Sequence, residues 1–234
     1  MLCLALDCSA KSASAALVKD GQLLAQYYQN SGLTHSRTLL PMVENILSNT
    51  EQTLDDVDCV AISHGPGSFT GLRIGISTVK GLCWGKDIPC RGVSTLEAMA
   101  YNLIHHEGLI CCVMDARRNQ VYNALFLSDG KTLTRLCDDR AVSTAELDNE
   151  LINYGKITYL VGDGTDLCSR ELTYQNIVLP PQQLKMQSAF GVAMAAVTSG
   201  TDIPASELTP TYLRLSQAER ERLEKIQNQI QNNQ

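Results

Sequence analysis

The segment SHGPGSFTGLR, residues 63–73, joins an apolar run, DCVAI, to a helix-like stretch, IGISTVKGLCWG. A buried strand followed by a turn and a helix is a unit from which α/β folds are built. Glycine permits close backbone approach, and the first turn of a helix leaves amide N–H groups free to bind an anion. The segment therefore predicts a strand–loop–helix junction that is either a tight packing turn or an anion site.

The glycine spacing in this loop excludes two well-known phosphate loops. No GxxxxGK[ST] sequence is present, and Gly65-x-Gly67-x-x-x-Gly71 is one residue too long for GxGxxG. The loop also follows the fourth predicted strand, whereas the dinucleotide fingerprint follows the first strand of its fold. Ser68 or Thr70 is suited to cap the helix.

Arg73 lies in the first turn of this helix, where a cation opposes the helix dipole. We expect it to have an anionic partner, which is a carboxylate of the chain, a partner chain or a ligand phosphate. The alternative is that the loop is an ordinary tight turn with an internal salt bridge.

The helix itself carries small residues one turn apart, at Gly71 and Gly75, and Gly81 and Gly85 continue the spacing. A glycine inside a helix costs up to about 1 kcal/mol relative to alanine. Small residues at this spacing let another helix come close. The pattern predicts a packing face, either within the chain or between chains.

Hydrophobic patterning predicts a first block with the order β-β-β-α-β-α-β-α. A short apolar run ends at Asp7, and the hairpin after it turns at Asp20-Gly21, a strong hairpin signal. The next segment has helical spacing with Pro41 inside it. The expected ranges are strand 2–7, hairpin 12–29, helix 34–50, strand 57–63, a helix to about residue 85, strand 88–94 and helix 95–106.

A second block repeats this plan as β-β-β-α-β-loop-α. Its first strand ends at Asp115, its hairpin turns at Asp129-Gly130, and Ser143 with Glu146 forms a capping-box pattern. The expected ranges are strand 109–116, hairpin 120–139, helix 143–154, a strand with a glycine loop over 157–166, and helix 188–200.

The duplicated plan predicts an α/β protein with two lobes, residues 1–105 and 106–205, each a mixed sheet flanked by helices. Residues 206–234 are predicted to be an extended piece followed by a polar helix with alternating charges. We expect this tail to pack toward the first lobe and to fray at its Gln/Asn-rich end.

The composition narrows the class of protein. A hydrophobic fraction of 44% and a charged fraction of 19% are typical of a globular protein with a real core. The net charge of −6 and the lack of a Lys/Arg cluster disfavour independent binding of tRNA or DNA. Neither a signal peptide nor an apolar run of the ~20 residues that span a bilayer is visible. Nine cysteines without a CxxC pair indicate reduced thiols and a cytoplasmic location.

Five segments together resemble one bacterial family. SHGPGSFTGLRIGISTVKGL occurs with ALDCSAKSASAALV, GVSTLEAMA, DARRNQVY and PTYLR in the order typical of the TsaB (YeaZ) family. The resemblance extends over the chain up to the polar tail, and the GPGSFTGLRIG block is highly specific. It implies two tandem lobes of the actin/Hsp70/sugar-kinase superfold, which are ribonuclease H-like, in agreement with the duplicated plan.

The resemblance also implies a function. Family members act in forming N6-threonylcarbamoyladenosine beside the anticodon of tRNAs that read codons beginning with A. In that system a TsaC enzyme supplies threonylcarbamoyl-AMP, and the catalytic paralogue TsaD transfers the carbamoyl group. The family implies a required, non-catalytic partner that binds TsaD through helices of its first lobe and works with the ATPase TsaE. It implies a homodimer when isolated, and contact with tRNA only through the complex.

The catalytic paralogue carries an HxEGH-type pair of metal histidines that this chain lacks. The corresponding stretch, GVSTLEAMA, has Val93, Ser94 and Thr95 in this place. His105 and His106 are adjacent, so they face different directions on a helix and are not a metal pair. Without a metal pair there is no Lewis acid to polarise the carbamoyl donor. We therefore expect no catalytic residue and no metal site.

An ATP-binding or ATP-hydrolysing kinase-like enzyme of the same superfold, acting alone, is the alternative. Asp7 and Asp163 stand where such enzymes place phosphate loops, but DCSAKSAS lacks their glycine-rich turn, so nucleotide affinity should be weak. Asp7 and Asp115 are equally typical of strand-end residues that cap neighbouring amides. ATP or ADP is thus expected at most at the level of a complex, and no Ser–His–Asp or zinc signature supports a peptidase. The candidate vestigial nucleotide or anion site comprises Asp7, Gly65, Gly67, Ser68, Thr70, Arg73, Asp115, Gly162 and Gly164.

The predicted partner interface lies on two helices of the first lobe. It comprises Ser36, Leu39, Leu40, Val43 and Leu47 on one helix, and Leu72, Gly75, Ile76, Val79 and Leu82 on the other. The sequence leaves open which of these face outward. On this prediction, Gly75→Leu should abolish binding of the paralogue without unfolding the chain.

Overall fold

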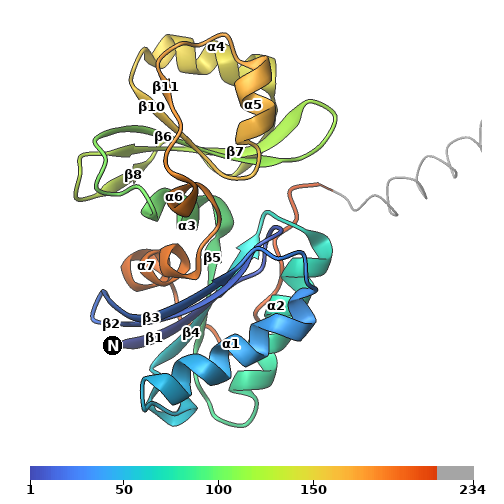
Figure 1. The fold of residues 1–234 in the computed structure, drawn as a ribbon, viewed down its shortest axis with the longest axis vertical. Coiled ribbons are helices and arrows are strands. Elements are labelled where there is room, and N and C mark those ends of the chain that lie inside the picture. Colours follow the sequence, from blue (N-terminus) through green and yellow to red (C-terminus); the bar gives the residue numbers. More distant parts are fainter. Residues whose placement is uncertain (215–234) are drawn as a thin grey trace, which may run out of the picture.

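The computed structural model describes residues 1–214, which form two sheets with helices between and around them (Figure 1). The first sheet has five strands in the order β3-β2-β1-β4-β5. β1 pairs antiparallel with β2 and parallel with β4, so the carboxyl ends of β1, β4 and β5 meet at one edge. The strands are β1 (Leu2–Asp7), β2 (Ala13–Lys19), β3 (Gln22–Gln29), β4 (Cys59–Gly65) and β5 (Cys90–Ser94).

Helices cover both faces of the first sheet. α1 (His35–Asn49) and α2 (Phe69–Cys83) pack side by side on one face, where Leu4, Leu6 and Ile62 meet side chains from both helices. The short 3-10 helix η1 (Leu54–Asp56) follows α1. On the other face, alternate residues of the same strands pack under α3 (Thr95–Tyr101) and α7 (Ala189–Ser199).

The second sheet has six strands in the order β11-β10-β6-β7-β8, with β9 paired to β7. α4 and α5 pack on one of its faces, while α3 and α6 contribute to the core on the other. α3 therefore lies between the two sheets. The elements are β6 (Gly108–Asp115), β7 (Gln120–Ser128), β8 (Leu133–Arg135), β9 (Arg140–Ser143), α4 (Thr144–Tyr154), β10 (Thr158–Val161), α5 (Thr165–Glu171), β11 (Ile177–Val178) and α6 (Gln182–Lys185).

α7 was predicted to belong to the second lobe, but it packs on the first sheet. Its buried residues Ala189, Val192, Ala193 and Ala196 lie against β1, β2 and β4 of the first sheet. Ile203 then forms an antiparallel bridge with Cys90 of β5. The first sheet is thus completed by residues beyond 188, and the predicted lobe of residues 106–205 does not match the packing at its carboxyl end.

The predicted elements of the first block are confirmed in order and type. In the second block the hairpin at Asp129-Gly130 and the capping box of Ser143 and Glu146 are also confirmed. The glycine loop after β10 leads directly into α5, which the sequence prediction missed together with β9, β11 and α6. The predicted polar tail helix lies outside the described residues, apart from the extended piece up to residue 214.

The extended piece is a strap, residues 206–214, that lies along the first lobe. Leu208 is fully buried in the core beneath α1 and α2, and the Thr211 amide donates a 2.7 Å hydrogen bond to the His64 carbonyl. At its end, the Arg214 guanidinium donates to the Ala116 carbonyl of the second lobe at 2.9 Å. The strap therefore joins the two lobes.

None of the helices within residues 1–214 combines the length and the apolar character needed to cross a bilayer. All nine cysteines lie in this part of the chain and are free thiols.

Candidate functional site

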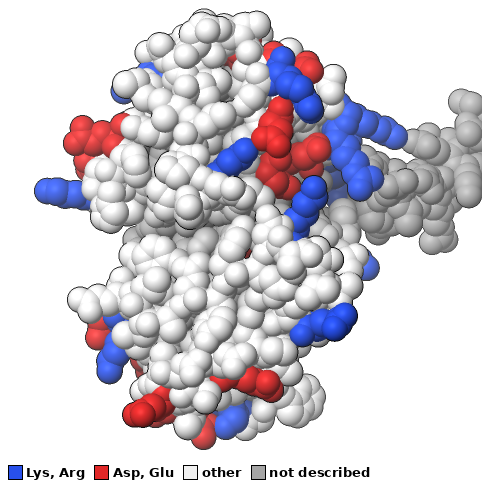
Figure 2. All heavy atoms as spheres, in the orientation of Figure 1, with Lys and Arg blue, Asp and Glu red and all other residues white. Residues whose placement is uncertain are grey.

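A cleft of about 490 Å³ opens between the lobes, where the carboxyl end of β1 faces the turn between β6 and β7. Acidic and basic side chains gather at the level where the two lobes meet (Figure 2). Residues that line the cleft include Ser9, Lys11, Gly67, Ser68, Thr70, Asp115, Asp163 and Arg214.

The cleft brings together only part of the predicted anion site. Gly67, Ser68, Thr70 and Asp115 line it. Asp7, Gly162 and Gly164 do not line the cleft. Gly65 and Arg73 face the strap instead. The candidate site is therefore a real cleft with a smaller set of residues than the sequence suggested.

Asp7 is buried at the end of β1, with 1% of its surface exposed. Its carboxylate accepts hydrogen bonds from the Ser9 amide at 3.2 Å, from the Ser9 hydroxyl and from the Ser63 hydroxyl. Burial raises the pKa of Asp7 to about 6, although these hydrogen bonds oppose the shift. Asp7 thus caps a neighbouring amide and ties β1 to β4, which is the structural role considered for it above.

The glycine loop is packed against the chain's own backbone. A Cβ on Gly67 would lie 2.5 Å from the Ser9 carbonyl oxygen, and one on Gly65 would lie 2.2 Å from that of Thr211. The Ser68 amide donates to the Ser9 carbonyl at 2.7 Å, and the Ser68 hydroxyl caps α2 by accepting from the Gly71 amide at 3.3 Å. Two amides of this junction, those of Ser68 and Gly71, therefore already have partners in the chain.

Arg73 has no carboxylate partner within residues 1–214, which corrects the expected salt bridge in this part of the chain. Its Nε donates to the Tyr212 hydroxyl at 3.0 Å, and its guanidinium carbon lies 5.8 Å from the Tyr212 ring and 6.0 Å from the Phe69 ring. These two rings stack at 4.4 Å. Arg73 therefore fastens the strap to α2 through aromatic contacts.

The second lobe contributes a carboxylate pair to the cleft. Asp115 is exposed and accepts a 2.7 Å hydrogen bond from the Arg117 amide. The next turn holds Arg117, Arg118 and Asn119 at positive φ, a conformation that costs free energy for residues other than glycine. Burial raises the pKa of Asp163, whose carboxylate accepts from the Gln187 amide group at 3.1 Å.

The first two glycines of α2, Gly71 and Gly75, face the sheet of their own lobe. A Cβ on Gly71 would lie 2.1 Å from the Cys8 carbonyl oxygen, and one on Gly75 would lie 2.6 Å from Cys8 Sγ and 3.0 Å from Ile62 Cδ1. Gly81, by contrast, has nothing within 4 Å of that position. The inner glycines let α2 sit directly on β1 and β4, so the packing face is intramolecular.

Most of the predicted interface residues share this inward orientation. Among residues 1–214, the structure buries Leu39, Val43, Leu72, Gly75, Ile76 and Val79 in the first lobe. Ser36 and Leu40 are exposed, and Leu47 and Leu82 are partly buried against the core. The six buried residues are therefore removed from the interface, because their side chains already pack against the sheet. Gly75→Leu would force side-chain atoms into Cys8 and Ile62, so the expectation that it leaves the fold intact is wrong.

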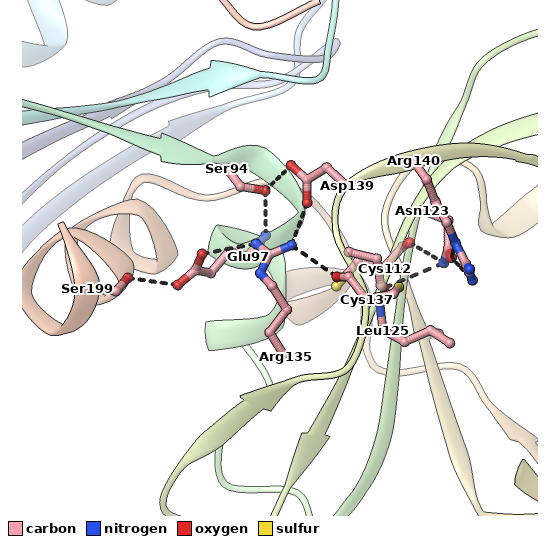
Figure 3. Close-up of polar contacts among 11 residues, drawn as sticks. Ser94, Glu97, Cys112, Asn123, Leu125, Arg135, Cys137, Asp139, Arg140 and Ser199 are labelled. Atoms are coloured by element: carbon pink, nitrogen blue, oxygen red, sulfur yellow. Dashed lines mark hydrogen bonds and ion pairs between the residues drawn. The ribbon is translucent and has the colours of Figure 1, made fainter. Parts of the chain in front are cut away.

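A polar network at the lobe junction was missed by the sequence analysis (Figure 3). The Arg135 guanidinium donates to Glu97 at 3.0 Å and to Asp139 at 2.7 Å, and it lies 4.7 Å from the centre of the Phe126 ring. The Ser94 hydroxyl donates to Asp139 at 2.5 Å and caps α3. The network joins α3 to β8 and the segment before β9. The two hydrogen bonds that reach from Ser94 and Glu97 to this segment join residues 45 and 38 positions apart in sequence, which no local pattern reveals.

Comparison with known proteins now identifies the family. Residues 29–221 match the family model described as TsaD, tRNA N6-adenosine threonylcarbamoyltransferase. The chain is 30% identical to the tRNA threonylcarbamoyladenosine biosynthesis protein TsaB of Bacillus subtilis, over 94% of this chain and 96% of that protein. The chain belongs to the TsaB family. The TsaB protein of Escherichia coli is also 30% identical, over 92% of this chain and 95% of its own length.

Solved structures agree with this assignment to the TsaB family. YeaZ from Pseudomonas aeruginosa superimposes with a TM-score of 0.74 at 26% identity, over 91% of this chain and 99% of that one. The ethanolamine utilization protein EutJ from Carboxydothermus hydrogenoformans shares the fold alone, with a TM-score of 0.51 at 15% identity over 83% of this chain and 90% of its own. The predicted fold class, two tandem actin/Hsp70-like lobes with mixed sheets, is confirmed.

Proposed function

We propose that this chain is a non-catalytic, required partner of a TsaD-type transferase that forms N6-threonylcarbamoyladenosine in tRNA. Family membership supports the pathway, since relatives of nearly equal length carry that name. The chain's own geometry supports the non-catalytic role. Ser94 and Glu97 stand in the stretch where the resemblance places the paralogue's metal histidines, and they bind Arg135 and Asp139 instead. These side chains hold the lobes together and are not available to a carbamoyl donor.

The interlobe cleft supports at most a weak nucleotide site. The Ser68 amide of its loop bonds to Ser9, and the Asp7 carboxylate is enclosed by Ser9 and Ser63. Lys11, Asp115 and Asp163 still line the opening. A nucleotide that enters this cleft would meet the second lobe's carboxylates more directly than the first lobe's loop, so we assign ATP or ADP to the complex and not to this chain alone.

We place the partner surface on the outward face of α1 and α2. This docking face consists of Ser36, Leu40, Leu47 and Leu82, with Gly81 beside them. Leu40 is 44% exposed although it is apolar, and α1 and α2 lie next to each other on the sheet. The absence of a side chain at Gly81 leaves room for a helix of the partner to approach. The same face is our proposal for the homodimer formed in isolation, and a TsaE-type ATPase and tRNA would join through the complex in the cytoplasm.

The test of this surface is co-purification of the chain with its TsaD-type paralogue. Leu40→Glu should reduce the amount of complex at least tenfold, because a carboxylate would be buried at the contact. Ile152→Glu is the matched control, since Ile152 is 49% exposed on α4 of the other lobe. Complex formation that is unchanged in Leu40→Glu, or lost equally in Ile152→Glu, contradicts the proposed surface.

The test of the function is synthesis of the modified nucleoside from tRNA, threonylcarbamoyl-AMP, ATP, the paralogue and the TsaE-type ATPase. We expect product only when this chain is added, and none from this chain without the paralogue. Size-exclusion chromatography of the chain alone and with the paralogue, with and without ATP, reports the assembly. Modified tRNA made by this chain alone would overturn the non-catalytic role, and ATP turnover by it alone would favour the kinase-like alternative.

A further inference from the structure

Two cysteines meet where α2 ends and β5 begins. Cys83 is the last residue of α2 and Cys90 is the first of β5. Their Sγ atoms lie 3.5 Å apart, which is hydrogen-bond contact between thiols. A disulfide needs the two atoms at about 2.05 Å, so an approach of about 1.5 Å separates the pair from a covalent bond. Cys83 borders the loop of residues 84–89, where a small movement can supply this approach.

One member of the pair, Cys83, borders a groove that opens to the surface, whereas Cys90 is fully buried and does not line it. This groove has a volume of about 500 Å³, and Cys83 lines it together with Trp84, Ile88 and Pro204. Trp84, which lies at the edge of this groove, is 86% exposed. Only 4% of the surface of Cys83 is exposed, so an oxidant that enters the groove would reach the pair through this residue.

The surroundings of the pair favour a thiolate on one sulfur. The hydrogen bond between the two thiols lowers the pKa of Cys90 and raises that of Cys83, and the Lys80 ammonium group nearby also lowers the pKa of Cys90. Burial and a neighbouring thiol act in the opposite direction on Cys90. The thiolate is the form of cysteine that reacts with oxidants.

A second thiol pair in the same lobe provides a comparison. Cys3 and Cys59 are register partners on β1 and β4, and a hydrogen bond from Cys3 lowers the pKa of Cys59. Their exposed fractions are 0% and 1%, and they pack in the core that α7 covers. Neither lines the groove. The two pairs have similar chemistry and differ in that one thiol, Cys83, borders the groove.

We propose that Cys83 and Cys90 form a redox-active dithiol that hydrogen peroxide closes to a disulfide. The Cys83 thiol passes its proton to the Cys90 thiolate along their hydrogen bond and attacks one peroxide oxygen, the O–O bond breaks, and the Cys83 sulfur becomes a sulfenic acid while the other oxygen leaves as water after protonation. The second sulfur then attacks the sulfenic sulfur, the S–S bond forms, and the remaining oxygen leaves as water. In sum, two thiols and one hydrogen peroxide give one disulfide and two waters, and a small-molecule thiol reverses the step by exchange.

The chain contains its own reporter for this reaction. Trp84 is the single tryptophan and is the neighbour of Cys83 in sequence. A disulfide next to an indole quenches its fluorescence, so closure of the pair should lower the emission and a thiol reductant should restore it.

The test is treatment of the folded chain with hydrogen peroxide, followed by thiol counting and peptide mapping without reductant. We expect two of the nine thiols to be lost. Trypsin cuts after Lys80, Lys86 and Arg91, so Cys83 and Cys90 fall in separate peptides, residues 81–86 and 87–91. The expected product is these two peptides joined, 2 Da lighter than their sum, and it should disappear after reduction.

Variants separate this dithiol from general oxidation of buried cysteines. Cys83→Ala and Cys90→Ser should each remove the crosslink and the reversible fluorescence change, while Cys3→Ser should retain both. Circular dichroism establishes that each variant is folded, and two variants at the site guard against misfolding of one. The proposal is overturned if a Cys3–Cys59 crosslink appears as fast as the Cys83–Cys90 crosslink. It is equally overturned if peroxide yields only singly oxidised cysteines, or if the folded chain loses no thiol under conditions that oxidise the unfolded chain.

Discussion

The two lobes build the same junction and use it differently. In the first lobe, the turn after β4 and the start of α2 pack on the end of β1, with Gly71 against the Cys8 carbonyl at 2.1 Å from the Cβ position. In the second lobe, the turn after β10 and the start of α5 pack on β6, with Gly162 against the Val113 carbonyl at 2.0 Å. Each first strand also ends in an aspartate whose carboxylate accepts the amide two residues on.

The aspartates at these equivalent positions have opposite surroundings. Asp7 is buried and is bound by two serines, whereas Asp115 is exposed and lines the cleft. The difference shows that the shared topology determines how the backbones approach each other, while the side chains decide whether the strand end remains open to a ligand. In this chain the first lobe's strand end is closed by the protein itself.

The largest expected effect comes from the glycines that both lobes share. Gly71→Ala and Gly162→Ala should each lower the free energy of unfolding by about 3 kcal/mol or more, because the added Cβ would overlap a backbone carbonyl. Gly162 also has φ of +113°, where an L residue is strained. Urea denaturation followed by circular dichroism measures both. If either variant stays within about 0.5 kcal/mol of the parent, the close approach in that lobe is not tight.

The buried aspartate should give the next largest effect, visible as a pH dependence. The folded pKa of Asp7 is raised from 3.8 to about 6, so the native state binds the proton more tightly than the unfolded state does. Its contribution to stability therefore falls by about 3 kcal/mol as the pH rises from about 4 to about 6 and is constant above that. Asp7→Asn should remove this decline, as measured by urea denaturation at pH 4, 5, 6 and 7.

The same slope in Asp7→Asn as in the parent chain would show that Asp7 does not titrate in this range. The matched substitution Asp115→Asn tests the other lobe. It should change the free energy of unfolding at pH 7 by less than about 0.5 kcal/mol, because this side chain is exposed.

The contact between the lobes should give an intermediate effect. Arg135→Met keeps the apolar stem over Phe126 but removes the charge that binds Glu97 and Asp139. We expect a loss of about 2 kcal/mol, since two partly buried carboxylates lose their partner. Thermal denaturation measures this loss. Arg37→Met on the exposed face of α1 is the control, and an equal loss in both variants would argue against a specific role for the network.

The smallest expected effect has the opposite sign. Gly81→Ala should stabilise the chain by about 0.5 to 1 kcal/mol, because α2 gains helix propensity and nothing lies within 4 Å of the new Cβ. Comparison of its free energy of unfolding with that of Gly71→Ala distinguishes a glycine that packs against the sheet from one that faces outward in the same helix. If Gly81→Ala destabilises the chain instead, the space around this Cβ position is not open as the structure indicates.

The sequence predicted what depends on neighbouring residues. The strand that ends at Asp7, the turn at Asp20-Gly21 and the capping box at Ser143 are all encoded within a few positions, and each is confirmed. The amide-capping alternative for Asp7 and Asp115 also fits the structure.

The errors concern contacts between distant segments. The spacing predicts that α2 has a glycine face but does not show that this face meets β1, which is why the sequence alone places Gly75 at an interface. The partner of Arg73 is Tyr212, 139 positions away, and the pattern gave only the charge that needed a partner. The Arg135 network was missed for the same reason.

The position of α7 has a consequence for synthesis of the chain. Together with α3, residues 189–199 cover one face of a sheet whose strands all precede residue 95. A ribosome would therefore finish every strand of the first sheet long before the helix that shields Ala5, Ala16 and Ala61 emerges. The first lobe therefore completes its core only after the second lobe has been synthesised, and a fragment that stops before residue 189 would leave the part of this sheet face that α7 covers open to water or to other nascent chains.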